Sequence, residues 1–367
     1  MTMTLSPTLF MYIGRQFLIW FLVVLFSMIS VVILIDAVEL IRRSATKADV
    51  STAVITSMAL LRAPYLAQEI IPFAAMFGSL LTYFQLTRHH ELVVIRSTGV
   101  SVWQFMLPSL LVVVFIGIAN VTLLNPLSSV LLSQFEEMEG RHITGRSSLL
   151  AVSSSGIWLR QAYEQEGQAV IHAQSIESDE LKLREVIVFL LEEKDKFIGR
   201  LDAKSATLAE GRWEFSEVWL TGPEKAGEFL PSHSLVTDLT PEKIQDSFAS
   251  PETVSLWSLP RFFRILEETG FAATSHRLQL HALLAEPILL IAMVMIAASF
   301  SMRLSRRGSA SLLIAAGVMT AFILFIFTNL VHAIGLGGAV PVVLAAWTPA
   351  GVSLLAGVAL LLHLEDG

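Results

Sequence analysis

Hydrophobic and polar residues alternate along this chain in long blocks, and six of the apolar blocks are about 20 residues long or longer. An α-helix needs about 20 apolar residues to cross the hydrocarbon core of a bilayer. We therefore predict six membrane-spanning helices, over Phe17–Ile35, Val54–Phe84, Val102–Leu124, Leu278–Met302, Ser311–Ile334 and Val340–Leu362. Hydropathy falls between the third and the fourth block, so the predicted architecture is three spans, a polar insert and three further spans.

The insert, roughly Glu139–Pro251, has the pattern of an all-β domain. Short runs rich in β-branched and aromatic residues are separated by glycine-containing turns, at a spacing that favours a sandwich or a jelly roll. The runs are Gly156–Arg160, Ala169–His172, Arg184–Leu191, Lys196–Ala206 and Arg212–Leu220. In the last run Trp213 and Phe215 alternate, and after them Val218 and Leu220 alternate, so these four side chains are candidate inward positions.

A helix is predicted where the chain returns from the insert to the membrane. Ser258 is its predicted N-cap, Pro260 lies in the first turn and Gly270 ends it. Its apolar residues predict packing at the membrane surface, and they are Phe262, Phe263, Ile265 and Leu266. The predicted domains are 1–138 for the first three spans, 139–255 for a β-jelly-roll-like domain, and 256–367 for the connecting helix and the last three spans.

The segment Thr87–Ser101 lies between the second and third spans, and it is too polar to cross a membrane and too patterned for a slack loop. Its apolar positions Leu92, Ile95 and Val100 form a stripe at helical spacing, and Gly99 suits a helix stop. Its charged residues are Arg88, Glu91 and Arg96. A short helix held against the spans on one face commonly meets a partner on the other, and the alternative is that these charges are merely interfacial.

Composition agrees with an integral membrane protein. Hydrophobic residues make up 54% of the 367 positions, charged residues only 16%, and the mean hydropathy is +0.65. The net charge of −7 provides no basic surface for nucleic acid, so we exclude nucleic acid as a partner. The absence of cysteine excludes a disulfide framework and a thiolate metal site. The first apolar block is too long for the core of a signal peptide, so we expect a retained helix.

Basic residues near the ends of the spans predict the orientation in the membrane. If the spans alternate, most of these residues fall on one side, which the positive-inside rule makes cytoplasmic. They are Arg15, Arg88, Arg96, Arg303, Arg306 and Arg307. The insert then lies on the opposite side, together with the exceptions Arg42, Arg43 and Lys47. Either nearby acidic residues simply offset these three cations, or the cations have a function there.

The sequence has no motif of an enzyme that supplies its own energy. There is no G-x-x-x-x-G-K-[ST] phosphate loop, no H-E-x-x-H and no G-x-S-x-G. His89, His90 and Glu91 are adjacent, so on a helix they point in different directions and do not form a metal site. Transport against a gradient would therefore need energy from another subunit, and Thr87–Ser101 is the segment suited to receive it, since rigid-body motion of a bound ATPase can tilt the attached spans.

Glu286, which precedes Pro287 in the fourth predicted span, is a candidate functional residue. Carboxylates inside membrane spans are costly and frequently functional. It either faces a central cavity or pairs with His281. Three further residues are predicted to make interhelical hydrogen bonds, namely Asn120 in the third span and Asn329 and His332 in the fifth.

Several segments together resemble the LptF/LptG (YjgP/YjgQ) permease family. The stretch Glu91–Gly99, with the sequence ELVVIRSTG, resembles the family's coupling segment. Further matches in chain order are Tyr12–Arg15, Asp36, Pro72 with Ala74–Gly78, Thr240–Lys243 and Leu256–Gly270. The resemblance covers essentially the whole chain, and the Asp36 and Thr240 segments favour the LptG branch over LptF.

This resemblance implies a fold, partners and a substrate. The chain would be a non-catalytic permease subunit in the inner membrane of a Gram-negative bacterium, with cytoplasmic termini and a periplasmic β domain. Its partners would be an LptF-like permease, an LptB-like ATPase dimer that holds ATP and Mg²⁺, an LptC-like anchor and an LptA-like periplasmic bridge. The transported molecule would be lipopolysaccharide, and this chain itself would need no cofactor and no metal.

The resemblance also implies roles for particular residues. Glu91 would pair with a basic residue of the ATPase, supported by Arg88, Arg96 and Gly99. Lipopolysaccharide would be bound near the outer end of the first span, where arginine forks suit phosphate. The expected contacts are Asp36, Glu39, Arg42, Arg43, Lys47 and Arg62. In LptG proteins basic residues can follow the acidic position directly, whereas here Glu39 and Leu40 intervene. For Arg62 the alternative is simple pairing with Glu69 or Asp36. The rival function is a membrane-anchored β-domain scaffold without transport activity.

Overall fold

The computed structural model describes residues 6–44, 51–144, 150–153, 156–163, 167–177, 182–192, 196–209, 211–222, 225–237, 239, 249–268, 271–304 and 310–365. The chain divides into a helical unit and a β unit, each of which is compact by itself. The helical unit comprises Met1–Phe135, Ser255–Trp257 and Thr274–Gly367, and the β unit comprises Glu136–Val254 and Ser258–Ala273. Lys47, Gly270 and Thr240–Lys243 lie outside the described residues.

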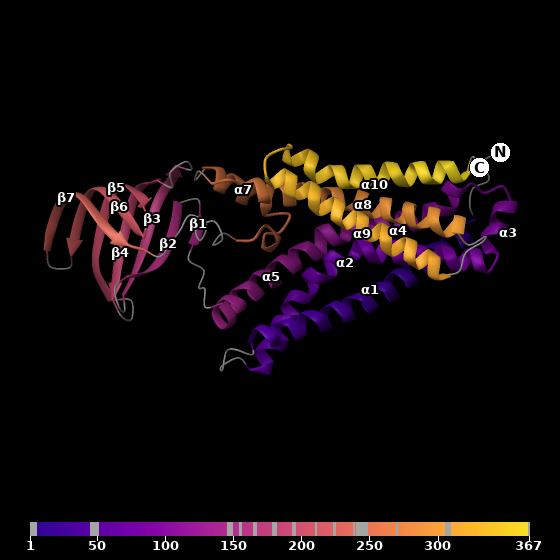
Figure 1. The fold of residues 1–367 in the computed structure, drawn as a ribbon, viewed down its shortest axis with the longest axis horizontal. Coiled ribbons are helices and arrows are strands. Elements are labelled where there is room, and N and C mark those ends of the chain that lie inside the picture. The colour runs from indigo at the N-terminus through magenta and orange to yellow at the C-terminus, as the bar shows by residue number, and fades with distance from the viewer. Residues whose placement is uncertain are drawn as a thin grey trace. The chain divides into compact units, whose positions relative to one another are not determined.

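Six helices of the described chain are long and apolar enough to cross a membrane, three before the β strands and three after them (Figure 1). They are α1 (Pro7–Ser44), α2 (Thr52–Arg88), the run of α4 (Val102–Ala119), η1 (Asn120–Leu124) and α5 (Asn125–Glu139), and then α8 (Thr274–Leu304), α9 (Ala310–Leu336) and α10 (Val342–Glu365). A second π-helical turn, η2 (Gly140–Thr144), follows α5. The predicted arrangement of spans around an insert is confirmed.

The first helix extends well beyond its predicted apolar core. α1 has 38 residues, about 57 Å of helix, whereas the hydrocarbon core is about 30 Å thick. Its last two turns carry the charged run from Asp36 to Arg43, which lies beyond the predicted span Phe17–Ile35. Glu39 bonds to Arg42 and Arg43 at helical spacings of three and four, and such pairs support continuation of the helix.

Small residues allow the helices of this unit to approach closely. A Cβ at Gly78 of α2 would lie 2.8 Å from Cα of Phe21 of α1, and one at Gly117 of α4 would lie 3.0 Å from Cα of Pro287 of α8. Side chains from α1, α2, α4 and α8 share one core, in which Ile13, Phe17 and Phe105 are fully buried. Close backbone approach at small residues is the usual basis of helix packing in membranes.

A seven-residue helix, α3 (Glu91–Ser97), separates α2 from α4. His90 precedes it with φ of +61°, and Gly99 follows it with φ of +84°. The predicted segment Thr87–Ser101 is thus not one helix, because left-handed residues break the chain on both sides of α3. Ser101 then caps α4 through a reciprocal pair of bonds with Gln104.

The β unit contains one antiparallel sheet of seven described strands, in the order of the sequence. The strands are β1 (Leu150–Ser153), β2 (Gly156–Tyr163), β3 (Gly167–Glu177), β4 (Lys182–Glu192), β5 (Lys196–Ala209), β6 (Arg212–Gly222) and β7 (Lys225–Val236). The inserted all-β domain is confirmed. Its connectivity is a meander, since consecutive strands pair, whereas a jelly roll uses Greek-key connections.

The sheet curls so that its two ends meet over a shared core. Gln161 of β2 accepts hydrogen bonds from Nε1 of Trp213 in β6 at 3.2 Å and from Oγ1 of Thr237 at 2.7 Å, although β2 and β6 are not neighbours in the sheet. Trp213, Phe215 and Val218 are buried as predicted, and the half-buried Leu220 packs against the same core. The curl provides the two facing layers that the sandwich pattern predicted.

Helix α7 (Leu259–Glu268) directly follows Ser258, whose carbonyl accepts a bond from N–H of Phe262 at 2.9 Å. It belongs to the β unit, whereas we had grouped it with the last three spans. Leu259 and Leu266 are its buried side chains. The three residues before Ser258 belong to the helical unit, where N–H of Leu256 donates to Oδ1 of Asn125 at 2.8 Å.

Candidate functional site

Helix α3 has one face packed against the spans and one face exposed. Leu92 and Ile95 are buried, as is Val100 just beyond the helix, which confirms the predicted apolar stripe. Between them Val93 and Val94 are 59% and 64% exposed. Val93 and Val94 are thus available for contact with another protein, since apolar side chains gain by removal from water.

The charged residues predicted near this helix lie on two different elements and have different contacts. Glu91 is the first residue of α3, and its Oε2 accepts a hydrogen bond from the hydroxyl of Tyr12 in α1 at 3.0 Å. Arg96 lies exposed in the last turn of α3. Arg88 belongs to the last turn of α2 and not to the short helix. The helix therefore presents Glu91 and Arg96 beside the exposed valines, with Arg88 on the preceding element.

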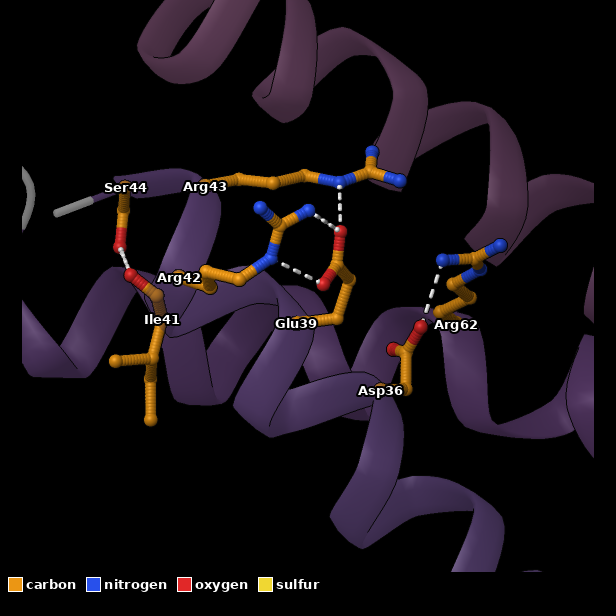
Figure 2. Close-up of polar contacts among 7 residues, drawn as sticks. All are labelled: Asp36, Glu39, Ile41, Arg42, Arg43, Ser44 and Arg62. Atoms are coloured by element: carbon orange, nitrogen blue, oxygen red, sulfur yellow. Dashed lines mark hydrogen bonds and ion pairs between the residues drawn. The ribbon is translucent and has the colours of Figure 1, made fainter. Parts of the chain in front are cut away.

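A second polar site joins α1, α2 and α5. Oδ1 of Asp36 lies 2.7 Å from Nη1 of Arg62, and the Arg62 guanidinium stands 5.2 Å from the ring centroid of Phe135. The side chain of Asp36 is 11% exposed and that of Arg62 31% exposed. The sequence offered Glu69 and Asp36 as pairing partners for Arg62, and the structure shows pairing with Asp36 (Figure 2). Asp36 Oδ2 and Arg62 Nε are buried without a hydrogen-bond partner among the described residues.

The neighbouring arginines share one carboxylate, as Figure 2 shows. Glu39 accepts from Nε and Nη2 of Arg42, both at 2.7 Å, and from Nε of Arg43 at 2.9 Å. The side chains of Arg42 and Arg43 are 73% and 47% exposed. Three arginines and two carboxylates leave this cluster, without Lys47, with a net charge of 3 − 2 = +1. A phosphate would therefore compete with Glu39 for the arginine forks.

Glu286 is held by a partner different from the one that we predicted. Its Oε1 accepts a hydrogen bond from Nδ2 of Asn120 at 2.5 Å, which confirms the interhelical bond of Asn120. Asn329 instead donates at 2.9 Å to the carbonyl of Phe325 in its own helix. Pairing with His281 is wrong, because five residues along a helix turn the two side chains about 140° apart. Nδ1 of His281 is buried without a hydrogen-bond partner in the described part of the chain. Asn120 is the first residue of the π-helical turn η1, and π turns are frequent at functional sites.

Sequence reasoning missed several residues that the fold brings to these sites. Phe135 was not predicted to contact Arg62, and Gln16, Trp20 and Gln85 were not singled out. Gln16 and Gln85 carried a usable signal, because an uncharged polar side chain inside an apolar helix requires a hydrogen-bond partner. Among the described residues, no group of three or more histidine, cysteine, aspartate or glutamate residues is arranged to hold a metal ion.

Comparison with known proteins gives a consistent result over nearly the full length. The family model described as lipopolysaccharide export system permease LptF/LptG matches residues 11–363. The lipopolysaccharide export system permease protein LptG of Escherichia coli strain K12 is 23% identical over 362 residues, covering 96% of this chain and 97% of that protein. The protein of the same name from Haemophilus influenzae is 21% identical over 355 residues, covering 93% and 94%. This chain therefore belongs to the LptF/LptG family of lipopolysaccharide export system permeases.

Proposed function

We propose that this chain is an LptG-type permease subunit that extracts lipopolysaccharide from the inner membrane and passes it to a periplasmic bridge. The energy comes from ATP, hydrolysed with Mg²⁺ in a separate LptB-like ATPase dimer. An LptF-like permease completes the membrane part, and an LptC-like anchor and an LptA-like protein continue the path. The chain is itself non-catalytic and needs no cofactor of its own.

The observation that carries this proposal is helix α3. It is short, it lies between two spans, its apolar stripe is buried against them, and it exposes Val93, Val94 and Arg96. A membrane-anchored scaffold has no need of such an element. An ATPase that binds the exposed face and moves as a rigid body would push α3, and the buried stripe would pass the push to the spans.

The cluster at the far end of α1 supports an anionic amphiphile as substrate. Arg42 and Arg43 are the exposed members, with Glu39 as an exchangeable counter-ion, and Arg62 is the more buried one. Arginine forks match the geometry of phosphate. Lipopolysaccharide combines phosphates with acyl chains, so it suits cations placed at the end of an apolar span.

The orientation follows from α3 and from the distribution of arginines near the spans. With α3 facing an ATPase, both termini are cytoplasmic and the β unit is periplasmic. The first turn of α1, α3 and the last turn of α10 lie at one end of the helical unit, as an even number of spans requires (Figure 1).

Co-purification and charge reversal test the proposal together. We expect a second permease and an ATPase to remain with this chain in mild detergent, and we expect ATP-dependent release of lipopolysaccharide from vesicles to a periplasmic acceptor. Glu91→Arg should abolish release while the β unit stays folded. Glu228→Arg, which reverses an exposed carboxylate on β7, is the matched control. Full release with Glu91→Arg, or a chain that purifies without an ATPase, would favour the scaffold.

A further inference from the structure

Three polar side chains on one face of α1 bond to the last turn of α2 and to the first residue of α3. Tyr12, Gln16 and Trp20 are spaced by four residues, which places them in one row along a helix. The Tyr12 hydroxyl donates to Oε2 of Glu91 at 3.0 Å. Nε2 of Gln16 and Nε1 of Trp20 both donate to Oε1 of Gln85, at 3.0 Å and 2.6 Å. These three hydrogen bonds join five residues, which we call the polar row: Tyr12, Gln16, Trp20, Gln85 and Glu91.

Apolar packing surrounds the polar row. Ile13 and Phe17, which lie between its members on α1, are fully buried in the same core as Leu92 and Ile95 of α3. Apolar contacts resist separation of two helices but are not directional, whereas hydrogen bonds require particular atoms to face one another. The polar row therefore specifies the register of α1 against the end of α2 and against α3.

We infer that the polar row holds α1 to the end of α2 and to the coupling helix α3, so that the three move as one body during transport. Tyr12 is then a positioning residue, which holds the Glu91 carboxylate toward the ATPase. A carboxylate has about four acceptor positions, so a bond from Tyr12 to Oε2 leaves capacity for a cation of the ATPase. This inference rests on the proposed role of α3 as the ATPase contact.

Helix α1 connects the polar row to the polar cluster of Asp36, Glu39 and the arginines at its other end. From Tyr12 to Asp36 α1 is continuous over 24 residues, about 36 Å of helix. No loop interrupts this path, and the described helix contains no internal proline. A displacement of α3 would thus reach Asp36, Glu39 and Arg42 through a single rigid element, which joins the ATPase side to the substrate side.

The first test removes one hydroxyl from the complete exporter. Tyr12→Phe should leave assembly and basal ATP hydrolysis unchanged but lower the lipopolysaccharide released per ATP by about threefold to tenfold, the loss expected for one hydrogen bond. Ser30→Ala is the control, because Ser30 of α1 donates only within its own helix, to the carbonyl of Phe26 at 2.7 Å. An unchanged ratio with Tyr12→Phe would overturn the inference. If Glu91→Arg also leaves the ratio unchanged, the proposed function itself fails.

The second test asks whether a covalent link can replace the hydrogen bonds of the polar row. This chain has no cysteine, so Gln16→Cys with Gln85→Cys introduces its only two thiols. The double variant should lose coupling, since two hydrogen bonds are removed, and a short bifunctional thiol reagent should restore release per ATP to within about twofold of the original chain. If the hydrogen bonds of the polar row must break during transport, the result is the opposite. The cross-linked complex would then stop releasing lipopolysaccharide. Either that arrest or a failure to rescue would overturn the inference.

Discussion

Replacement of Arg62 by alanine should destabilise the helical unit by about 2 to 3 kcal/mol. Asp36 is only 11% exposed, so without Arg62 its carboxylate remains largely buried with no cation beside it. Breaking a fully buried ion pair costs about 3 to 5 kcal/mol, and exposed pairs contribute about 0 to 1 kcal/mol. Arg62 is 31% exposed, which admits some water and places this pair below the fully buried value. Loss of the contact with the Phe135 ring adds to the cost.

The double replacement separates the charge from the packing. Asp36→Asn with Arg62→Met removes both charges and keeps similar volumes, so we expect it to lie within about 1 kcal/mol of the original chain. The free energy of unfolding can be followed in mixed micelles by the fluorescence of the tryptophans. A cost below about 0.5 kcal/mol for Arg62→Ala, within the range of ordinary surface substitutions, would refute the buried pair.

The same variants decide between the two roles of Arg62. If Arg62 contacts lipopolysaccharide, photo-crosslinking of the lipid near the outer end of α1 should fall in the double variant even though its stability is kept. If crosslinking is retained, Arg62 serves only to neutralise Asp36, and the substrate contacts lie elsewhere in the cluster.

Three further replacements test other parts of the structure. Glu39→Gln frees both neighbouring arginines from their shared carboxylate, so lipopolysaccharide crosslinking should rise severalfold at low salt, and an unchanged yield would exclude competition. Gly78→Ala brings a methyl group to 2.8 Å from the Phe21 backbone and should cost about 1 to 3 kcal/mol in the same unfolding assay. Glu286→Gln keeps an acceptor for Asn120, so stability should change by less than about 1 kcal/mol, and lost release would show that transport needs the carboxyl group.

Most elements of this fold could be predicted from the sequence, because each element depends on a physical requirement that neighbouring residues must meet. A helix in lipid must present about 20 apolar residues, so the spans were visible as blocks. Alternation in β6 correctly placed Trp213 and Phe215 inside, since successive strand residues point to opposite faces. Val218 is inside because Glu217, with φ of +54°, shifts the alternation by one residue. The boundaries were less accurate: the charged end of α1 stays helical because Glu39 pairs with Arg42 and Arg43 at helical spacing.

The sequence by itself thus determined the order of spans and strands and the polarity of each face, which depend on residues close together in the chain. The tertiary structure alone decided the partners: Tyr12 bonds to Glu91 across 79 positions, Arg62 to Asp36 across 26 and Glu286 to Asn120 across 166. Hydropathy restricts which face of a helix is buried, but many side chains share that face. Only the packing of the helices against one another brings a particular donor within reach of a particular acceptor.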